Sequence, residues 1–249
     1  MAINTFARKE IKFLLDIDQY KNLMEEIPKY MNPDKFCVDG KEYGVYNIYY
    51  DTADDLLIRE SLAKPYYKEK IRLRSYYSPA NSDDTVFLEI KKKIGGIVAK
   101  RRVTMKLSES DEYLSSRCKP EYSKYITGQV FNELDYFLDM YNVVPKQYIS
   151  YQRTAFFGKD NHDFRLTFDR KITKRRHDLS LSCESYGDQI IREDQRLMEV
   201  KVLDSVPAWL INKLSELHIY KTSFSKYGRA YQDYILNQKN TNRSVYANV

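Results

Sequence analysis

The sequence is poor in the residues that interrupt or cross-link a chain: its 249 residues include 8 glycines, 7 prolines and 3 cysteines. So few glycines and prolines exclude collagen-like and low-complexity architectures. Cys37, Cys118 and Cys183 are odd in number and lack the spacing of a metal site, which argues against a disulfide framework. Because the first residues show no secretory signal, these cysteines indicate a reducing, cytoplasmic setting.

Several common functional devices are also missing. No hydrophobic run approaches the roughly 18 residues of a membrane-spanning helix, so we expect no membrane segment in this chain. His162, His177 and His218 lie far apart in the sequence and predict no Ser-His-Asp catalytic set. The pair Gly95-Gly96 is typical of a hairpin turn rather than of a glycine-rich phosphate loop.

Charge and aromatic residues are what the sequence has in abundance. Hydrophobic residues make up 43% and charged residues 31%, which indicates a folded, soluble chain rather than a disordered one. The 23 tyrosines and 11 phenylalanines favour strands. The net charge of +6 is only a weak indication of an anionic partner. No linker or repeat divides the chain, so we expect one domain over residues 1–249, with a core at about 8–238 and a flexible polar tail at 239–249.

Strands that cluster in hairpins alternate with helices along the chain, an order typical of an α+β fold with an antiparallel sheet. Strands are predicted at 7–15, 43–51, 66–77, 85–93, 97–107, 145–157, 162–171, about 178–185, and 196–203. Helices are predicted at 18–30 with Asp18 as the cap, at 54–62, within 108–141, at 207–217 and at 226–237, and a short connection at 221–225.

One face of nearly every predicted strand is charged. Side chains alternate along a strand with period two, so residues such as Arg72 and Arg74 share a face. Eleven basic and four acidic residues lie on this face, an excess of seven positive charges against six for the whole chain. The basic residues are Lys12, Lys70, Arg72, Arg74, Lys91, Lys93, Lys100, Arg102, Arg153, Arg165 and Lys201, and the acids are Glu10, Glu89, Asp169 and Glu199.

A solvated outer face is the ordinary explanation for such a pattern. However, like charges on neighbouring strands repel one another, and here basic pairs recur from strand to strand. Enclosed cations need paired anions, and bound phosphates would supply them through bidentate contacts with arginine. The helices would cover the opposite, apolar face. The sequence therefore predicts a closed antiparallel β-barrel with a charged interior and a coat of helices.

The residues of this face also form an ordered series that resembles a known superfamily. The series is Glu10-x-Lys12, Arg72-x-Arg74, Glu89-x-Lys91, Lys100-x-Arg102, Tyr151-x-Arg153, Arg165, Glu199-x-Lys201 and Phe224-Ser225-Lys226. It resembles the triphosphate tunnel metalloenzymes (CYTH-like proteins), and it is most similar to the catalytic domain of the vacuolar transporter chaperone (VTC) polyphosphate polymerases. The resemblance covers about residues 8–230.

This resemblance implies a tunnel in which the γ-phosphate of ATP is transferred to a polyphosphate chain. It implies that Glu199, with Glu10 as a second candidate, holds Mn²⁺ or Mg²⁺. The catalytic residues that it implies are Lys12, Arg72, Arg74, Lys91, Arg165 and Glu199. Lys12, Arg72, Arg74, Lys91, Lys100, Arg102, Arg153, Arg165, Lys201 and Lys226 would bind phosphates, and Tyr151 and Ser225 would donate hydrogen bonds to them.

The series departs from the superfamily at one point, and alternatives stay open. Tunnel triphosphatases typically begin with Glu-x-Glu-x-Lys, whereas Arg8 replaces the first glutamate here, which favours transfer over hydrolysis. A metal-dependent triphosphatase with Glu10 or Glu89 as base is the second hypothesis, and a non-catalytic binder of polyphosphate or nucleotides is the third. We expect no nucleic-acid binding, because that function favours an open basic groove with stacking aromatic residues.

Overall fold

A single antiparallel sheet organises the chain in the computed structural model, which describes residues 9–246, with side chains to residue 240. Its strands follow the order β11-β1-β10-β8-β7-β3-β4-β5-β6, while β2 pairs with β7 and β9 pairs with β8. The alternating pattern of the sequence therefore predicts the α+β class correctly. The strands are β1 (Lys9–Leu15), β2 (Met31–Pro33), β3 (Tyr43–Thr52), β4 (Tyr67–Ser75), β5 (Thr85–Ile94), β6 (Ile97–Lys106), β7 (Val143–Gly158), β8 (Arg165–Arg175), β9 (Asp188–Gln189), β10 (Arg196–Val202) and β11 (Lys221–Thr222).

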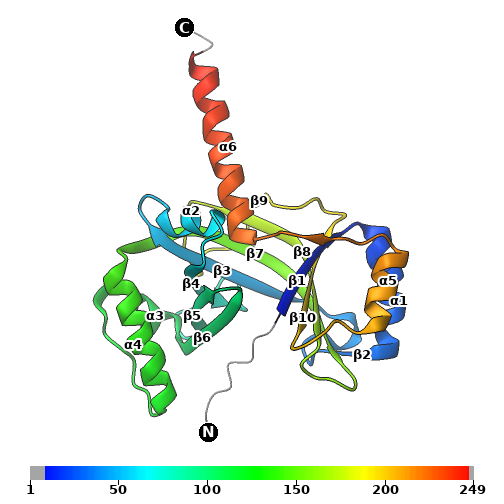
Figure 1. Ribbon diagram of the computed structural model, residues 1–249. Coiled ribbons are helices and arrows are strands. Elements are labelled where there is room, and N and C mark those ends of the chain that lie inside the picture. The colour runs from blue at the N-terminus through cyan, green and yellow to red at the C-terminus, as the bar shows by residue number, and fades with distance from the viewer. Residues whose placement is uncertain (1–8, 247–249) are drawn as a thin grey trace.

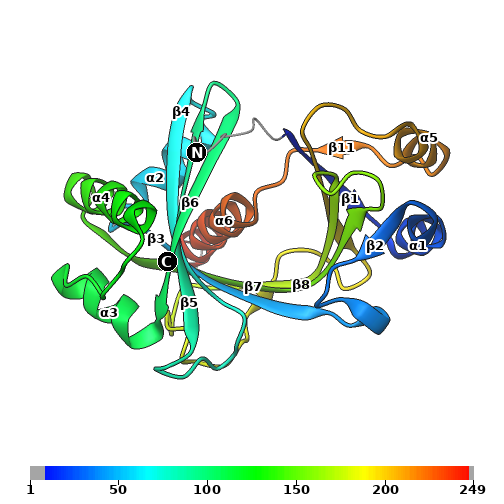
Figure 2. The same cartoon turned by 90° about the horizontal axis from the view of Figure 1, so that it is seen from below.

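The sheet is strongly curved, so that the arm formed by β4, β5 and β6 faces the arm formed by β1 and β10 (Figure 2). The predicted closure is not confirmed, because among the described residues β6 and β11 form the two ends of the sheet and do not pair. Contact between the arms is made by side chains instead: Lys91 Nζ of β5 lies 3.7 Å from Glu10 Oε2 of β1. Closure depends on strand tilt and stagger, which the residue pattern alone does not specify.

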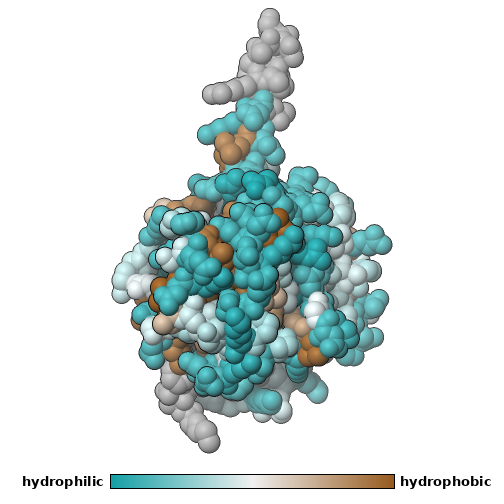
Figure 3. Space-filling model, turned by 90° about the vertical axis from the view of Figure 1, so that its right-hand side faces the viewer, coloured by the Kyte–Doolittle hydropathy of each residue, from teal (hydrophilic) through white to brown (hydrophobic). Residues whose placement is uncertain are grey.

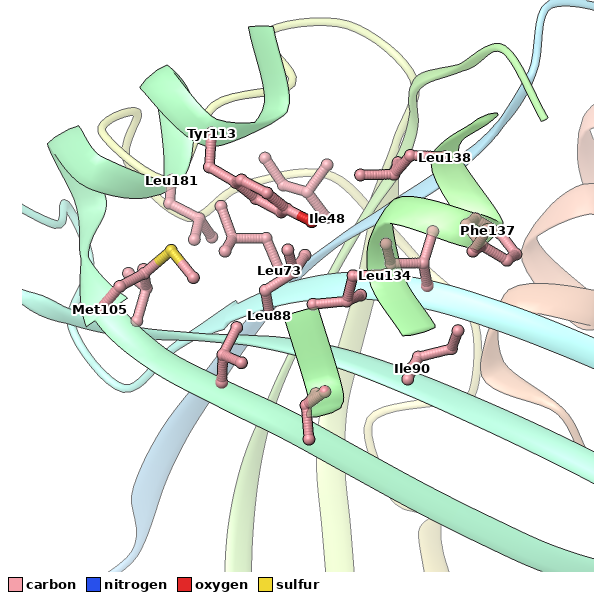
Figure 4. Packing of buried hydrophobic residues seen from close by; sticks show 14 of the residues in the cluster. Ile48, Leu73, Leu88, Ile90, Met105, Tyr113, Leu134, Phe137, Leu138 and Leu181 are labelled. Carbon is pink, nitrogen blue, oxygen red and sulfur yellow. The ribbon is translucent and has the colours of Figure 1, made fainter. Parts of the chain in front are cut away.

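Helices cover the outer face of both arms, as predicted (Figure 1). On the β4–β6 arm, Leu73 and Leu88 pack against Leu134 and Phe137 (Figure 4). On the other arm, strand residues such as Met198 pack in a separate cluster with residues of α1 and α5. The surface on that side is mostly hydrophilic with scattered apolar residues (Figure 3). The covering helices are α1 (Ile17–Tyr30), α3 (Leu107–Ser116), α4 (Tyr125–Met140) and α5 (Ala208–Glu216).

The last helix, α6 (Lys226–Tyr246), is an exception to the predicted outer coat. Its residues Tyr227 and Tyr231 join a cluster with Tyr49 and Tyr151, which lie on the inner, charged face of the sheet. Figure 2 shows α6 end-on inside the curve of the sheet. The apolar stripe of α6 predicts that it packs on a sheet, but it does not determine on which face. Helix α2 (Leu56–Leu62) contributes to the same cluster.

Several predicted boundaries are wrong for local reasons. Helix α1 begins after Asp16, not at Asp18, because the Asp16 carboxylate accepts a hydrogen bond from Gln19 N at 2.8 Å in a capping box. The helical region 108–141 is interrupted after α3, where Arg117 adopts a φ of 66°.

Four further boundaries differ from the prediction. The strand predicted at 178–185 is not formed, and short β9 follows that region. Strands β2 and β11 were not predicted. The described part of the predicted tail, 239–246, continues α6 as helix. Residues 7 and 8, including Arg8, lie outside the described residues.

The short 3-10 helix Val38–Gly40 completes the described elements. None of the helices in the part of the chain that the structure describes has the length and apolarity to cross a bilayer.

Candidate active site

The charged residues predicted to share a face do converge on the inner face of the curved sheet. Directly paired residues on neighbouring strands point to the same side of a sheet. Arg72 of β4 pairs with Glu89 of β5, which in turn pairs with Arg102 of β6. On the other arm, Lys12 of β1 pairs with Glu199 of β10. The period-two argument thus places the charges correctly, strand by strand.

Glu89 is the centre of a first ionic cluster on the β4–β6 arm. Its carboxylate forms ion pairs with Arg72 Nε at 2.7 Å and with Lys100 Nζ at 2.6 Å, and Arg74 Nη1 lies 3.7 Å away. The Glu89 residue is 1% exposed. Burial alone would raise its pKa, but Arg72, Arg74 and Lys100 together hold the pKa far below its usual range. Glu89 is therefore a fixed anion that keeps three cations in place.

A second cluster joins β1, β7, β8, β10 and the start of α6. Lys226 Nζ lies between two carboxylates, at 2.6 Å from Asp169 Oδ2 and 3.0 Å from Glu199 Oε1. Arg153 of β7 donates both Nε and Nη2 to Asp169, at 2.6 and 2.7 Å. Lys12 Nζ lies 3.3 Å from Glu199 Oε1. The cations lower the pKa values of Asp169 and Glu199 in spite of their burial.

Glu10 connects the two arms. Its carboxylate lies 3.3 Å from Lys12 Nζ on its own strand and 3.7 Å from Lys91 Nζ on the opposite arm. Burial and the nearby Glu199 raise its pKa, but Lys91, Lys12 and Lys201 outweigh them and lower the pKa to about 2. The inner face is therefore one continuous set of alternating cations and anions rather than two separate clusters.

Positive charge exceeds negative charge on this face, and the pKa values of three lysines are lowered there. Burial lowers the pKa of Lys70 to about 7, and repulsion from Lys68, Lys91 and Lys12 adds to the effect. Burial and nearby arginines lower the pKa of Lys100 to about 7 against the attraction of Glu89. The pKa of Lys201 falls to about 8, mainly through burial. Crowded, partly desolvated lysines of this kind would be relieved by a bound anion.

This crowding predicts that anion binding takes up protons. A polyanion favours the protonated lysines, so its affinity should be highest below about pH 7 and fall as the pH rises toward about 9. Over the same interval the unbound protein should gain stability, because the unfolded chain binds more protons than the folded one. Calorimetric titration with inorganic triphosphate at about pH 8, in two buffers of different ionisation enthalpy, measures the uptake directly. Release of protons on binding, or no change in bound protons, would contradict the lowered pKa values of these lysines.

Three residues of β3 that are not among the predicted site residues also belong to the site. Tyr49 Oη accepts a hydrogen bond from Arg72 Nη1 at 3.0 Å, and Asn47 Oδ1 accepts one from Arg74 Nε at 2.9 Å. Asp51, on the same face, accepts a hydrogen bond from Tyr227 Oη of α6 at 2.9 Å. The sequence does contain a signal for them: residues 47, 49 and 51 alternate within the strand predicted at 43–51, so they share one face. These residues position the arginines and the first turn of α6.

Three predicted phosphate ligands lie at the margin of the inner face or have another local role. Arg165 Nη2 lies 3.3 Å from Asp34 Oδ2, in a loop after β2. The Arg102 guanidinium lies over the Phe87 ring at 4.7 Å. Ser225 Oγ accepts a hydrogen bond from Gly228 N at 3.1 Å and thus caps α6. Their assignment as phosphate ligands stays a prediction.

Tyr151 and Lys201 lie on the inner face, as predicted. The Tyr151 hydroxyl accepts a hydrogen bond from Arg74 Nη2 at 3.4 Å, and the Lys226 ammonium lies 4.5 Å from the centre of its ring. Lys201 pairs with Glu10 of β1 and with Arg165 of β8. Their roles toward phosphate also stay predictions.

The carboxylates of the inner face fit a hard divalent cation that takes most of its ligands from water and phosphate. Glu10 and Glu199 both lie 3.3 Å from Lys12 Nζ, so their oxygens converge on one cation already. Residues 9–240 contain no group of three or more acidic, histidine or cysteine side chains arranged to hold a metal. Mg²⁺ typically needs only one or two carboxylates when phosphate oxygens complete its shell.

Comparison with known proteins identifies a family and a shared fold. The VTC domain family matches residues 7–235 of the chain. A putative adenylate cyclase from Bacillus halodurans shares the fold, with a TM-score of 0.51 and 13% identity over 88% of this chain and 95% of the other. A putative adenylyl cyclase from Hippeastrum, described as having a dominant triphosphatase activity, aligns with a TM-score of 0.48 and 13% identity over 90% and 96%. No curated protein matches. The family match covers most of the chain, and the chain therefore belongs to the VTC domain family.

Proposed function

We propose that the chain is an ATP–polyphosphate phosphotransferase, which adds the γ-phosphoryl group of ATP to the end of a polyphosphate chain. An oxygen of the terminal phosphate of the chain bonds to the γ-phosphorus, and the bond from that phosphorus to the β,γ-bridging oxygen breaks. ADP leaves with that oxygen. The reaction needs positioning and charge neutralisation rather than a covalent nucleophile, and the inner face offers both.

The side chains of the inner face divide these tasks. Arg72 and Arg74 are held by Tyr49, Asn47 and Glu89, so their guanidinium groups are oriented before phosphate arrives. Such preorganised cations stabilise the charge that shifts between oxygens during transfer. Lys12 and Lys226, from the opposite side, supply charge close to Glu199. A divalent cation held by Glu199 and Glu10 would neutralise the phosphate oxygens further, and Mn²⁺ and Mg²⁺ are the candidates.

The observation that carries this proposal is the pairing of the carboxylates: Glu10, Glu89, Asp169 and Glu199 each lie within 4 Å of at least one lysine or arginine. Glu10, Glu89, Asp169 and Glu199 all have lowered pKa values because neighbouring cations stabilise their ionised forms. Groups of such low basicity accept a proton from water poorly. A phosphate end is already ionised and needs no base to act as acceptor. The inner face is therefore better suited to a phosphate acceptor than to water.

A metal-dependent triphosphatase is the second candidate, and the partly exposed position of Glu10 favours it most. Its side chain is 23% exposed, so water has access to it. The pKa of about 2 makes Glu10 a weak base, which is why we place hydrolysis second. A protein that only binds polyphosphate is the third possibility.

One assay distinguishes the three. The purified protein is incubated with ATP and Mn²⁺, and the products are separated on a gel stained for polyphosphate. A ladder of chains is expected. Free phosphate without a ladder would replace transfer by hydrolysis, and tight binding of triphosphate without either product would leave only the binding function.

A further inference from the structure

A row of four aromatic side chains extends the inner face beyond its charged part. Phe36, Tyr43, Tyr76 and Phe87 contact one another in sequence, with ring centres 6.0, 5.9 and 5.7 Å apart and planes inclined by 64–69°. We call these four residues the aromatic row. They come from four separate segments, namely the loop after β2, the first residue of β3, the residue after β4, and β5. The three contacts are all edge-to-face, a geometry typical of stable aromatic pairs.

The aromatic row lies on the same face as the phosphate-binding candidates. Tyr43 pairs with Arg153, and Phe87 pairs with Arg74. Tyr76 follows Arg72 and Arg74 at the same alternating spacing. The row also adjoins a cation directly, since the Arg102 guanidinium lies over Phe87 at 4.7 Å. The aromatic row and the cations therefore form one continuous surface.

Within that surface the row lies at the end remote from α6. Tyr227 of α6 stacks on Tyr49, with ring centres 4.8 Å apart. Tyr43 is six residues before Tyr49 on β3, which corresponds to about 20 Å along a strand. Along β5, Phe87, Glu89 and Lys91 occupy successive positions of the inner face, about 7 Å apart. A ligand that begins at Phe87 and extends along β5 would pass Arg102, which pairs with Glu89, and then Lys100 and Lys91, which pair with each other.

The row is too exposed to be explained by core packing. Phe36 is 61% exposed and Tyr76 is 39% exposed, and Tyr43 and Phe87 are only half-buried. Single exposed aromatic residues are common, but contiguous exposed aromatic residues beside a cationic surface are typical of binding sites. Exposed aromatic rings stack with nucleobases, and the neighbouring arginines complement phosphate attached to such a base.

We propose that the aromatic row binds the base of the nucleoside triphosphate whose phosphates occupy the cations of the inner face. This inference rests on the proposed function and deepens it, because it separates a nucleotide donor, which has a base, from a polyphosphate acceptor, which has none. The donor would enter from the side of the aromatic row, with its phosphates directed along β5 past Arg102 and Lys100. Tyr76, the exposed member in the middle of the row, contributes most to the binding of the base.

A pair of ligands with matched phosphates tests this inference. ATP and methyl triphosphate carry the same triphosphate ester, but only ATP has a nucleoside. The Tyr76→Ala variant should bind ATP about tenfold more weakly, while its affinity for methyl triphosphate stays within about twofold of the wild type. Tyr76→Phe retains the ring and should restore ATP affinity. Tyr125→Ala, which removes a residue that is 82% exposed on α4, should change neither affinity.

Unchanged binding of methyl triphosphate also shows that the Tyr76→Ala variant is folded. Equal weakening of both ligands, or no weakening of ATP, would overturn the inference and leave the proposed function standing. Failure of the wild-type protein to bind either ligand would overturn both.

Discussion

Replacement of Glu199 by glutamine should reduce the rate of phosphoryl transfer by at least about a hundredfold, without weakening the binding of metal-free triphosphate. Glu199 has three cations within 4 Å, namely Lys12, Lys226 and Arg153, as many as Glu89 has on the other arm. Glutamine keeps the shape and removes the charge. The cations would then be freer to bind phosphate, whereas the anionic ligand for a divalent cation would be lost.

The combination of lower turnover and retained or tighter binding separates this role from simple loss of structure. Glu133→Gln is the matched control, because Glu133 lies on α4 and pairs with Arg101, whose side chain is on the outer face. The control should leave both quantities unchanged. A Glu199→Gln protein with wild-type turnover would contradict the assignment of this carboxylate to the reaction.

Replacement of Glu89 by glutamine should have the largest effect on stability, and triphosphate should reverse part of it. The change leaves Arg72, Arg74 and Lys100 without the buried carboxylate that pairs with them. Removal of one partner of a buried ion pair typically costs about 3–5 kcal/mol of unfolding free energy. A ligand present at about 100 times its dissociation constant restores about 2.7 kcal/mol. Because the variant has one more net positive charge, its gain from triphosphate should exceed that of the wild type.

Chemical denaturation with and without inorganic triphosphate measures both parts of this expectation. Glu69→Gln is a suitable control, since Glu69 is also buried on β4 but accepts its hydrogen bond from Tyr67 Oη rather than from a cation. Triphosphate should raise the unfolding free energy of the Glu69→Gln protein by the same amount as that of the wild type. If triphosphate stabilised the Glu89→Gln and Glu69→Gln variants equally, Glu89 would not be the anion that substitutes for phosphate at the cations.

Much of the site could be predicted from the sequence because strand geometry is simple. The period of two places Arg72, Arg74 and Glu89 on one face, and burial of the opposite face against helices determines that this face is the inner one. The same rule places Asn47 and Tyr49 on this face, because they alternate along β3. What the rule cannot supply is the partner of each cation, because register and curvature decide that Lys91 meets Glu10 across the sheet.

Features that depend on the whole assembly were not predictable. The apolar stripe of α6 is compatible with either face of the sheet, and only the packing of Tyr227 on Tyr49 places it inside. The aromatic row is likewise invisible in the sequence, because Phe36 and Phe87 are separated by 50 intervening residues and meet only through Tyr43 and Tyr76. Closure of the sheet is set by stagger, which no residue pattern in this chain reveals.

The central claim is that the inner face of the sheet binds a chain of phosphates, and calorimetric titration with inorganic triphosphate tests it most directly. The wild-type protein should bind triphosphate, and Arg72→Ala and Arg165→Ala should each weaken binding by about tenfold or more, since charge-assisted contacts contribute about 1.5–3 kcal/mol. Lys239→Ala, which removes an exposed charge on α6, should change the affinity by less than about twofold. Equal effects of all three substitutions, or no binding by the wild type, would contradict the account.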